Sequence, residues 1–305
     1  MTRKLRIGSR GSDLALWQAR YVAGRVPGGA EIIVIKTRGD AIQHLSLDKV
    51  EGKGFFTKEI EAALLANEVD IAVHSYKDLP TEETAGLTIA AVPERAPVHD
   101  VIVAKTAALG HQTTTGLARH ARVGTSSIRR KAQLAATIDA LETVDLRGNV
   151  PTRVRKVEEG ELDAVVLAEA GLARLGLIAS APAKGLAVKR LPLEVMTPAA
   201  AQGALAIQIR ADDAEARAGV ALMNDIAVRR AVSVERALLA RFGGGCQLPL
   251  GVSCRAIDAN TVELIATITS PDGSDRLGAH TIGDEAKVVE EAHATLVTQG
   301  ALRYL

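Results

Sequence analysis

The feature that most constrains this chain is an order of strand, turn and helix that occurs twice in its first two-thirds. In each copy an apolar strand runs through Gly, Ser or Thr into a helix, and an Arg-Gly pair follows the next strand. The matches are IGSRGS at 7–12 with VGTSS at 123–127, TRGD at 37–40 with LRGN at 146–149, and EVDIAV at 68–73 with ELDAVV at 161–166. Chance could supply any one match, but three in one order predict two α/β domains built alike.

Short apolar strands alternate with helical patterns in this part of the chain, which is typical of doubly wound α/β sheets. The pattern predicts strands at 5–8, 31–36, 70–75, 87–92 and 98–104, a helix capped by Ser12 or Asp13, and a helix at 57–67. A further strand at 203–210 follows the second copy, which indicates that the chain crosses back to the first domain.

The order of predicted helices and strands changes after this strand. Helices are predicted at 213–224, 227–242 and 285–298, and strands at 251–257, 262–269 and 277–282. We therefore expect domain 1 at 1–97 with 202–219, domain 2 at 98–201, and a smaller α+β domain 3 at 220–305.

Composition excludes several classes of protein. The 37 Lys+Arg residues balance 36 Asp+Glu residues, and three Phe, three Tyr and one Trp offer little base-stacking surface, so a nucleic-acid partner is not expected. Two cysteines cannot make a disulfide framework, and the start of the chain lacks the apolar region of a signal peptide. The longest uncharged stretch, between Glu194 and Arg210, is too short and polar to span a membrane. We expect a soluble, cytoplasmic protein.

Arginines stand beside the turns from strand to helix. Such turns offer free backbone N–H groups and a positive helix end, and guanidinium groups bind carboxylates or phosphates with two hydrogen bonds. Each arginine alone could be a solvated loop residue, but together they favour an anion pocket. Because no P-loop or GxGxxG motif is present, a ligand with several carboxylates suits the pocket better than a phosphate. The arginines are Arg10, Arg38, Arg129, Arg130, Arg147 and Arg153.

The segment HSYKDLP at 74–80 ends the third predicted strand, at the edge where open α/β sheets bind ligands. Lys77 would keep the neighbouring Asp78 ionised and suited to stabilising a cation. The alternative is a surface Lys-Asp turn that ends at Pro80. We expect His74 to be a hydrogen-bonded core histidine, and the spacing of His and Cys residues predicts no metal site.

Three glycines precede Cys246 at 243–245. The absence of side-chain bulk would let a large group approach this thiol, which could act as a nucleophile or covalent anchor. The alternative is a helix C-cap followed by a buried structural cysteine. Cys254 lies within an apolar strand and is expected to fill the core.

These segments together resemble the porphobilinogen deaminase (hydroxymethylbilane synthase) family over nearly the whole chain. The matching stretches, in family order, are GSRGSDLALWQA from residue 8, TRGD from 37, GKGFFTKE from 52, HSYKDLP from 74, GTSSIRR from 124, LRGN from 146, AAAQGAL from 199 and GGCQLPLG from 244. The resemblance implies three domains, of which the first two are like type II periplasmic binding proteins. It also implies a dipyrromethane cofactor, held through a thioether to Cys246.

The resemblance further implies a monomeric transferase that takes porphobilinogen as its substrate. Four units would be added stepwise to the cofactor, each losing ammonia, before linear hydroxymethylbilane is released. Asp78, with Lys77 beside it, would be the catalytic group, because a fixed carboxylate can stabilise positive charge on the pyrroles and relay protons. The acidic arms of the rings would be held by Arg10, Ser12, Lys53, Lys77, Thr125, Ser127, Arg129, Arg130, Arg147, Arg153 and Arg174, while Lys53 and Lys58 lie in the segment that resembles the family's active-site loop.

The chain departs from the family's usual residues at three positions near these motifs. Asp13 replaces a frequent Pro and is interpreted as a helix cap, Tyr76 replaces a common Met, and Ala201 stands where Gly often precedes Gln202. A non-catalytic, two-lobed anion-binding protein is the rival interpretation, since a fold does not fix a function. Such a binder would need neither the Cys246 loop nor a third domain. A nucleic-acid regulator is disfavoured by charge and aromatic content.

Overall fold

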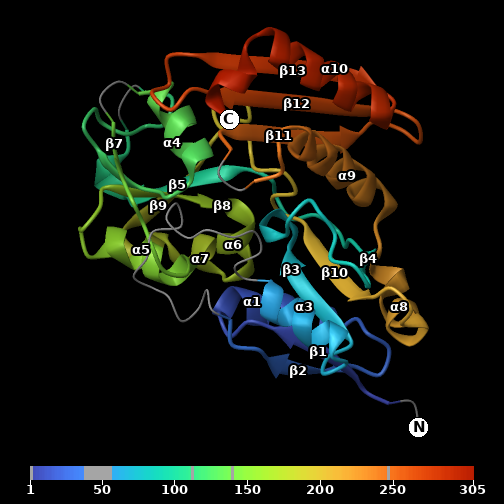
Figure 1. Cartoon of the computed structure of the whole chain (residues 1–305). Helices are drawn as coiled ribbons and strands as arrows, with labels where there is room; N and C mark the ends of the chain where they lie inside the picture. Colours follow the sequence, from blue (N-terminus) through green and yellow to red (C-terminus); the bar gives the residue numbers. More distant parts are fainter. Residues whose placement is uncertain (1–2, 38–56, 111–112, 139–140, 246–247) are drawn as a thin grey trace.

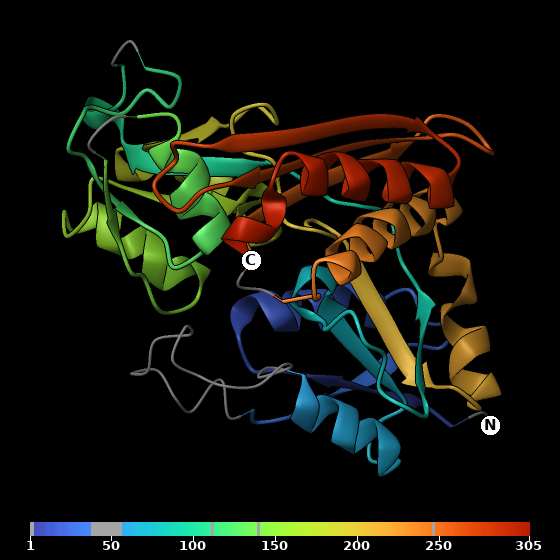
Figure 2. The ribbon, with the colours of Figure 1, turned by 45° about the horizontal axis from the view of Figure 1, so that its top comes forward.

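The computed structural model describes residues 3–37, 57–110, 113–138, 141–245 and 248–305. Within these ranges the strands form three sheets, two of five strands and one of three. Figure 1 shows them as separate bodies, the first in blue and cyan, the second in green and the third in orange and red. In both views helix α9 (Ile226–Arg241) lies between the three-stranded sheet and the first sheet (Figures 1 and 2).

The first sheet has the strand order β2-β1-β3-β10-β4. The first three strands are parallel, and β10 runs antiparallel to both of its neighbours. One layer of buried apolar side chains joins the sheet to α1 and α8, and another joins it to α3. The bounds are β1 Leu5–Ser9, α1 Asp13–Ala23, β2 Ala30–Val34, α3 Lys58–Leu65, β3 Ile71–Ser75, the 3₁₀ turn η2 Tyr76–Asp78, β4 Leu87–Ala91, β10 Leu205–Arg210 and α8 Ala214–Val220.

The second sheet repeats this arrangement with the order β7-β6-β8-β5-β9. Its parallel strands are β6, β7 and β8, and β5 is antiparallel to both neighbours. Apolar layers from α4 and from α5 to α7 cover its faces. The bounds are β5 Asp100–Lys105, η3 Thr106–Ala108, β6 Arg122–Gly124, α4 Ile128–Ala135, β7 Glu142–Val144, α5 Val150–Glu158, β8 Ala164–Ala168, α6 Glu169–Arg174, α7 Leu177–Ser180, η4 Pro182–Lys184 and β9 Leu186–Arg190.

Each five-stranded sheet contains one strand that is adjacent in sequence to strands of the other sheet. β5 follows β4 of the first sheet but lies in the second, and β10 follows β9 of the second but lies among the blue and cyan strands of the first (Figure 1). The predicted crossing of the chain is therefore confirmed. So is the predicted fold class, two similarly built α/β sheets with a smaller α+β body.

The repeat visible in the sequence extends to single hydrogen bonds. The backbone N–H of Arg6 donates to Asp70 Oδ2 at 2.9 Å, and the backbone N–H of Arg122 donates to Asp163 Oδ2 at 2.7 Å. Each acid stands just before the third parallel strand and fixes the start of the first. The shared Asp of the two copies thus has one structural cause.

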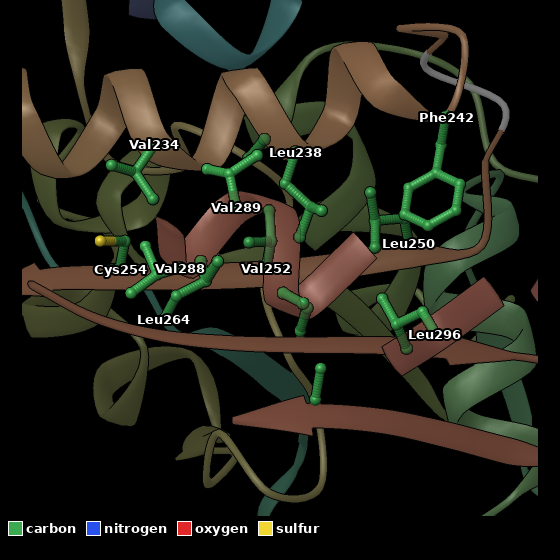
Figure 3. Close-up of a cluster of buried hydrophobic side chains, with 14 of the residues drawn as sticks. Val234, Leu238, Phe242, Leu250, Val252, Cys254, Leu264, Val288, Val289 and Leu296 are labelled. Carbon is green, nitrogen blue, oxygen red and sulfur yellow. The ribbon is translucent and has the colours of Figure 1, made fainter. Parts of the chain in front are cut away.

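The third sheet is an antiparallel meander of β11, β12 and β13, covered on one face by α9 and α10. Its core includes Cys254, Leu264 and Val288 (Figure 3). Asp225 and Asp284 cap the two helices by accepting backbone N–H groups of their first turns. The bounds are η5 Ala221–Met223, β11 Leu250–Ala256, β12 Val262–Thr269, β13 Arg276–Gly283, α10 Glu285–Thr298 and η6 Ala301–Tyr304.

The predicted strand at 262–269 and helix at 285–298 have the bounds that the sequence indicates. The helix expected at 213–224 instead ends at Val220 and continues as the 3₁₀ turn η5. The strand expected to reach residue 36 ends at Val34. Across the described ranges, no helix has both the length and the apolar character needed to cross a bilayer.

Candidate active site

Asp78 lies at the carboxyl edge of the first sheet, where β3 runs directly into η2. The buried side chains of Tyr76 and Leu79 anchor the chain on either side of it, while Asp78 itself is exposed. Asp78 lines a cavity together with Arg10 and Ser12. Three of the predicted site residues therefore meet at one edge, as ligand-binding residues of open α/β sheets do.

Arg236 on α9 holds this turn and was missed by the sequence reasoning. Its guanidinium donates to the carbonyl oxygens of Leu79 at 3.0 Å and Pro80 at 2.5 Å, and lies 4.4 Å from the centre of the Tyr76 ring. A cation over an aromatic face is a favourable contact. Tyr76, one of the departures from the family pattern, thus supports the turn that carries Asp78. Helix α9 carries several other charged residues, among them Arg229, Arg230 and Glu235, so no signal in the sequence singles out Arg236.

Lys77 is half-buried, and its side chain reaches the second connection between the sheets. Its Nζ lies 3.4 Å from Gln202 Oε1. Burial lowers the pKa of Lys77 to about 8, although the neighbouring Asp78 acts in the opposite direction. The charges of Arg129 and Arg130 add to the lowering, so Lys77 lies in the field of the second sheet's arginines.

Serines cap the two equivalent helices. Ser12 Oγ accepts the backbone N–H of Ala15 at 3.4 Å, and Ser127 Oγ accepts that of Arg130 at 3.4 Å. The interpretation of Asp13 as the cap is wrong, because Asp13 is the first residue of α1 and Ser12 precedes it as the N-cap. An acid in the first turn still stabilises the positive helix end.

Thr125 is buried in the turn before α4, where its Oγ1 accepts the backbone N–H of Ser127 at 3.3 Å. The predicted site residues of this turn therefore hold the loop and the helix start in place. Both hydroxyl groups keep a proton with which to donate to a ligand acid.

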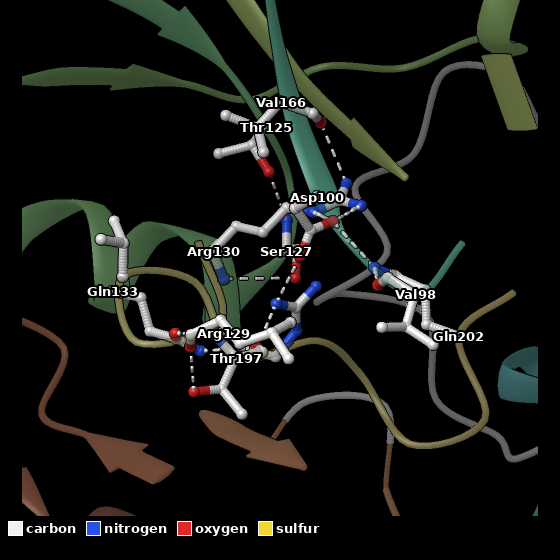
Figure 4. Close-up of polar contacts among 12 residues, drawn as sticks. Val98, Asp100, Thr125, Ser127, Arg129, Arg130, Gln133, Val166, Thr197 and Gln202 are labelled. Carbon is white, nitrogen blue, oxygen red and sulfur yellow. Dashed lines mark hydrogen bonds and ion pairs between the residues drawn. The ribbon is translucent and has the colours of Figure 1, made fainter. Parts of the chain in front are cut away.

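Arg129 and Arg130 are almost fully buried, with side chains 5% and 8% exposed, and both pair with Asp100 at the start of β5 (Figure 4). Arg129 Nη1 lies 2.8 Å from Oδ2, and Arg130 Nη2 lies 2.6 Å from Oδ1. Burial acts to raise the pKa of Asp100, but the two guanidinium charges outweigh it and hold that pKa well below its usual range. Sequence reasoning missed Asp100. The available signal was an acid opening a strand too apolar to leave it unpaired.

Arg147 and Arg153 add two more cations close to this pair. Among the described residues, Arg147 Nη2 is buried without a hydrogen-bond partner. Arg153 Nε donates to the Gly148 carbonyl at 2.8 Å. Burial lowers the pKa of Arg153 to about 10, and the charges of Arg130 and Arg147 lower it further, while Asp78 opposes them. The arginines of this region therefore outnumber the acidic side chains that the described residues place near them.

Arg174 on α6 reaches the first sheet's side. Its Nη2 donates to the Gly203 carbonyl at 2.7 Å, and its guanidinium lies 5.6 Å from the centre of the Trp17 ring. Burial lowers its pKa to about 10. Lys58 is the exposed first residue of α3. The predicted site residues Arg38, Lys53 and Cys246 lie outside the described residues.

The glycines before Cys246 end α9. The N–H of Gly243 donates to the Ala240 carbonyl and that of Gly244 to the Leu239 carbonyl, with φ values of +90° and +68°. This is a Schellman C-cap, so the helix-cap alternative holds for the glycines themselves. A Cβ on Gly244 would lie 2.1 Å from Thr81 Oγ1. The cap therefore also brings the chain before Cys246 against the segment that follows Asp78.

Two predictions of core roles are confirmed. His74 Nε2 lies 3.0 Å from Gln208 Oε1, and burial lowers the pKa of His74 to about 4. Cys254 is 4% exposed in the third sheet's core (Figure 3), and burial raises the pKa of its thiol to about 12. In the parts of the chain that the structure describes, His, Cys, Asp and Glu form no metal-binding group.

Comparison with known proteins identifies the family. A family model described as "Porphobilinogen deaminase, dipyromethane cofactor binding domain" matches residues 5–218, and "Porphobilinogen deaminase, C-terminal domain" matches 229–296. The chain belongs to the porphobilinogen deaminase family. The porphobilinogen deaminase of Brevibacillus brevis is 41% identical over 98% of this chain and 95% of that protein. The porphobilinogen deaminase of Syntrophus aciditrophicus is 46% identical over 81% and 79%.

Solved structures with low similarity were also found. An ancestral arginine-binding protein bound to arginine has a TM-score of 0.39 at 15% identity, over 73% of this chain and 91% of that one. The periplasmic VFT2 domain of BvgS from Bordetella pertussis has a TM-score of 0.42 at 14% identity, over 72% and 86%.

The cofactor of the porphobilinogen deaminase family is dipyrromethane, for which residues 5–218 form the binding domain. The residues present fit a ligand that carries carboxylates. Arg147 has a buried nitrogen without a partner among the described residues, and Arg153 meets mostly like charges. An acidic group would satisfy both guanidinium groups, because a buried cation is stable only when it is paired.

Proposed function

We propose that this chain is a hydroxymethylbilane synthase, a transferase that joins four porphobilinogen units head to tail with loss of ammonia. One observation carries the proposal. The exposed carboxylate of Asp78 acts on Lys77 and on Arg153, and Arg153 also feels the charge of Arg147, which has a nitrogen buried without a hydrogen-bond partner among the described residues. The dipyrromethane, when bound, supplies the pyrrole to which the first unit is joined.

Asp78 would act on the cationic states of the substrate. Loss of ammonia from the aminomethyl group of porphobilinogen leaves a positive charge delocalised over the pyrrole. A fixed carboxylate stabilises that charge without the reorganisation that water would need, and it can move a proton at the ring nitrogen. Because its turn is anchored by Tyr76, Leu79 and Arg236, Asp78 would keep its place through the reaction.

The cationic residues would bind the acetate and propionate arms of the rings. Guanidinium groups hold carboxylates in fixed geometry, and hydroxyl groups at helix starts add donors beside a positive helix end. Lys77 would orient the ring next to Asp78. The proposed carboxylate-binding residues are Arg10, Ser12, Lys53, Thr125, Ser127, Arg129, Arg130, Arg147, Arg153 and Arg174.

Cys246 would carry the cofactor through a thioether. Intact-mass measurement and peptide mapping test this directly, with an excess of two pyrrole units on Cys246 expected. Cys246→Ser should lack the adduct, because a hydroxyl is a far poorer nucleophile than a thiolate. Cys254→Ser is the matched control and should keep it, since Cys254 is buried in the core. An adduct on Cys254 would refute the assignment.

The proposed division of the chain is 1–97 with 202–219, 98–201, and 220–305. The separate core of the third sheet and the strand exchange between the other two support it. The balance of charges and the reaction class support a cytoplasmic monomer that acts on a small molecule without nucleic acid.

Ammonia release from porphobilinogen by the purified chain tests the proposed function against its rival. A hydroxymethylbilane synthase releases ammonia and yields a product that cyclises and oxidises to a coloured porphyrin. A two-lobed anion-binding protein would bind porphobilinogen without releasing ammonia. Binding without turnover by protein that carries its two pyrrole units would reject the proposal.

A further inference from the structure

Two buried side chains, Asp100 and Gln202, link the first and second sheets at the proposed site. Each comes from one of the two connections that cross between these sheets. Asp100 opens β5 directly after the first crossing, and Gln202 lies in the second crossing just before β10. The crossings touch, because the N–H of Ala96 donates to the Gly203 carbonyl at 3.2 Å. A Cβ on Gly203 would lie 2.4 Å from the Ala96 carbonyl oxygen, so this approach requires glycine.

Both carboxylate oxygens of Asp100 accept hydrogen bonds from the arginine pair. Oδ1 accepts from Arg130 Nε at 3.0 Å and Nη2 at 2.6 Å, and Oδ2 accepts from Arg129 Nη1 at 2.8 Å. A backbone carbonyl adds one further acceptor for each arginine. The Thr197 carbonyl accepts from Arg129, and the Val166 carbonyl accepts from Arg130. These bonds hold both guanidinium groups against Asp100 (Figure 4).

Gln202 continues the network into the first sheet. Its side chain is fully buried, and its Nε2 donates to the Val98 carbonyl at 2.8 Å and to Asp100 Oδ1 at 3.1 Å. Its Oε1 lies 3.4 Å from Lys77 Nζ. The amide therefore uses both donors and its acceptor, and connects the residue before Asp78 to the arginine pair of the second sheet.

We propose that Asp100 and Gln202 are positioning residues for the reaction, which hold the Arg129–Arg130 pair and Lys77 in one geometry across the two sheets. The proposal rests on the proposed function and deepens it. Neither residue needs to touch substrate. Arg129 and Arg130 share one acid, and the half-buried Lys77 lies in the same field, so Asp100 orders these cations without neutralising them all, and a ligand carboxylate can supply the remaining charge.

The chain offers a matched control for each residue. Asp70 is a second fully buried carboxylate bound by arginines, but it stands at the opposite edge of the first sheet. Gln208 is a second buried glutamine, bonded to His74 and to Glu61, within β10. Asp70→Asn and Gln208→Met therefore report what the same chemical changes do to the fold alone.

The experiment compares Asp100→Asn and Gln202→Met, and their controls Asp70→Asn and Gln208→Met, with the wild-type holoenzyme. Ammonia release gives kcat and KM for porphobilinogen, native mass spectrometry counts the retained pyrrole rings, and thermal melting gives stability. Gln202→Met should lower kcat roughly 10- to 100-fold with KM within about threefold of wild type, since small displacements in a site have such effects. Asp100→Asn should raise KM or reduce the retained rings. Asp70→Asn and Gln208→Met should change melting temperature alone.

Equal kcat in Gln202→Met and Gln208→Met, after correction for folded protein, would overturn the proposal. If Asp100→Asn does not accumulate as folded protein, the glutamine pair decides alone. An inactive wild type that carries both rings would reject the proposed function instead. An active wild type whose site variants match their controls would reject only the positioning role.

Discussion

Two buried carboxylates, Asp70 and Asp100, are each surrounded by arginines, yet their neighbours differ in how much water they reach. Asp70 binds Arg3, Arg6 and Arg210, whose side chains are 48%, 29% and 16% exposed. The arginines of Asp100 are only 5% and 8% exposed. The first cluster lies at the amino edge of its sheet, whereas the second lies at the carboxyl edge, close to Asp78.

The difference separates stability from function. Arginines that remain partly exposed keep part of their hydration while they bind an acid, so pairing them costs less than pairing buried ones. Dehydrated arginines that share one acid with a lysine lower stability unless a ligand completes them. A fold gains nothing from such an arrangement by itself, and perturbed charges of this kind gather at functional sites. The carboxyl edge is therefore built for a ligand, and the amino edge for the fold.

The largest expected effect is on turnover at the carboxyl edge. Asp78→Asn should lower kcat roughly 1,000-fold, about 4 kcal/mol, because an amide of similar shape cannot offset positive charge on a pyrrole. Asp78 is exposed, so melting temperature should stay within about 2 °C of wild type. Ammonia release and melting curves check both. Near-normal turnover would remove Asp78 from the central role.

Two arginines of the same edge should respond differently to leucine. Arg129→Leu takes a partner from buried Asp100 and should destabilise the fold by about 3 kcal/mol. Arg147→Leu removes a nitrogen that is buried without a partner among the described residues, so it should cost the cofactor-free protein less than about 1 kcal/mol. Urea unfolding measures these differences.

Both variants should lose retained rings or stall elongation, because each would leave a ligand acid unpaired. Native mass spectrometry separates the two outcomes by ring count. Normal loading and normal product release in both would show that these arginines do not hold ligand acids.

The amino edge should show its role in the pH dependence of stability. Burial opposes ionisation of Asp70, but hydrogen bonds from Arg6 and Arg3 dominate and hold its pKa well below the usual range. An acid with a lowered folded-state pKa contributes stability above its unfolded pKa of about 3.9, and loses that contribution as pH falls.

Asp70→Asn should therefore cost about 2 kcal/mol at pH 7, a difference that shrinks toward pH 3. Urea unfolding at pH 7, 5 and 3 measures it, and kcat per folded molecule should be unchanged. A pH-independent difference would show that Asp70 contributes through shape and not charge.

The sequence predicted the two similar sheets because each copy carries the same local signals. A glycine turn, a serine cap and an acid before the third strand depend only on neighbouring residues. The pairing of Arg129 and Arg130 with Asp100 could not be predicted, because the arginines lie on helix α4 and the acid opens strand β5, 29 and 30 residues away. The motif predicts that the arginines bind a ligand, but their own counter-ion becomes visible only once β5 lies in the second sheet.

The crossing itself yields the smallest expected effect, at Ala201, which stands where the family often has glycine. Ala201 has a φ of +60° and is fully buried, and its N–H donates to Glu235 Oε2 at 2.7 Å. A side chain in this left-handed conformation costs about 1–2 kcal/mol, which glycine would relieve. Glycine also loses about 0.8 kcal/mol of methyl burial and about 0.4–1 kcal/mol through its freer unfolded chain.

These contributions nearly cancel, so Ala201→Gly should change the free energy of unfolding by no more than about 0.8 kcal/mol in either direction. Ala201→Val is the control and should destabilise strongly, since a β-branched residue tolerates neither this φ nor the closed space. Because Gln202 follows directly, kcat in Ala201→Gly also reports whether the backbone before it must be stiff. A fall in kcat with unchanged stability would show that the stiff backbone at Ala201 matters as well as the Gln202 amide. Both would then hold the site residues of the two sheets in one geometry.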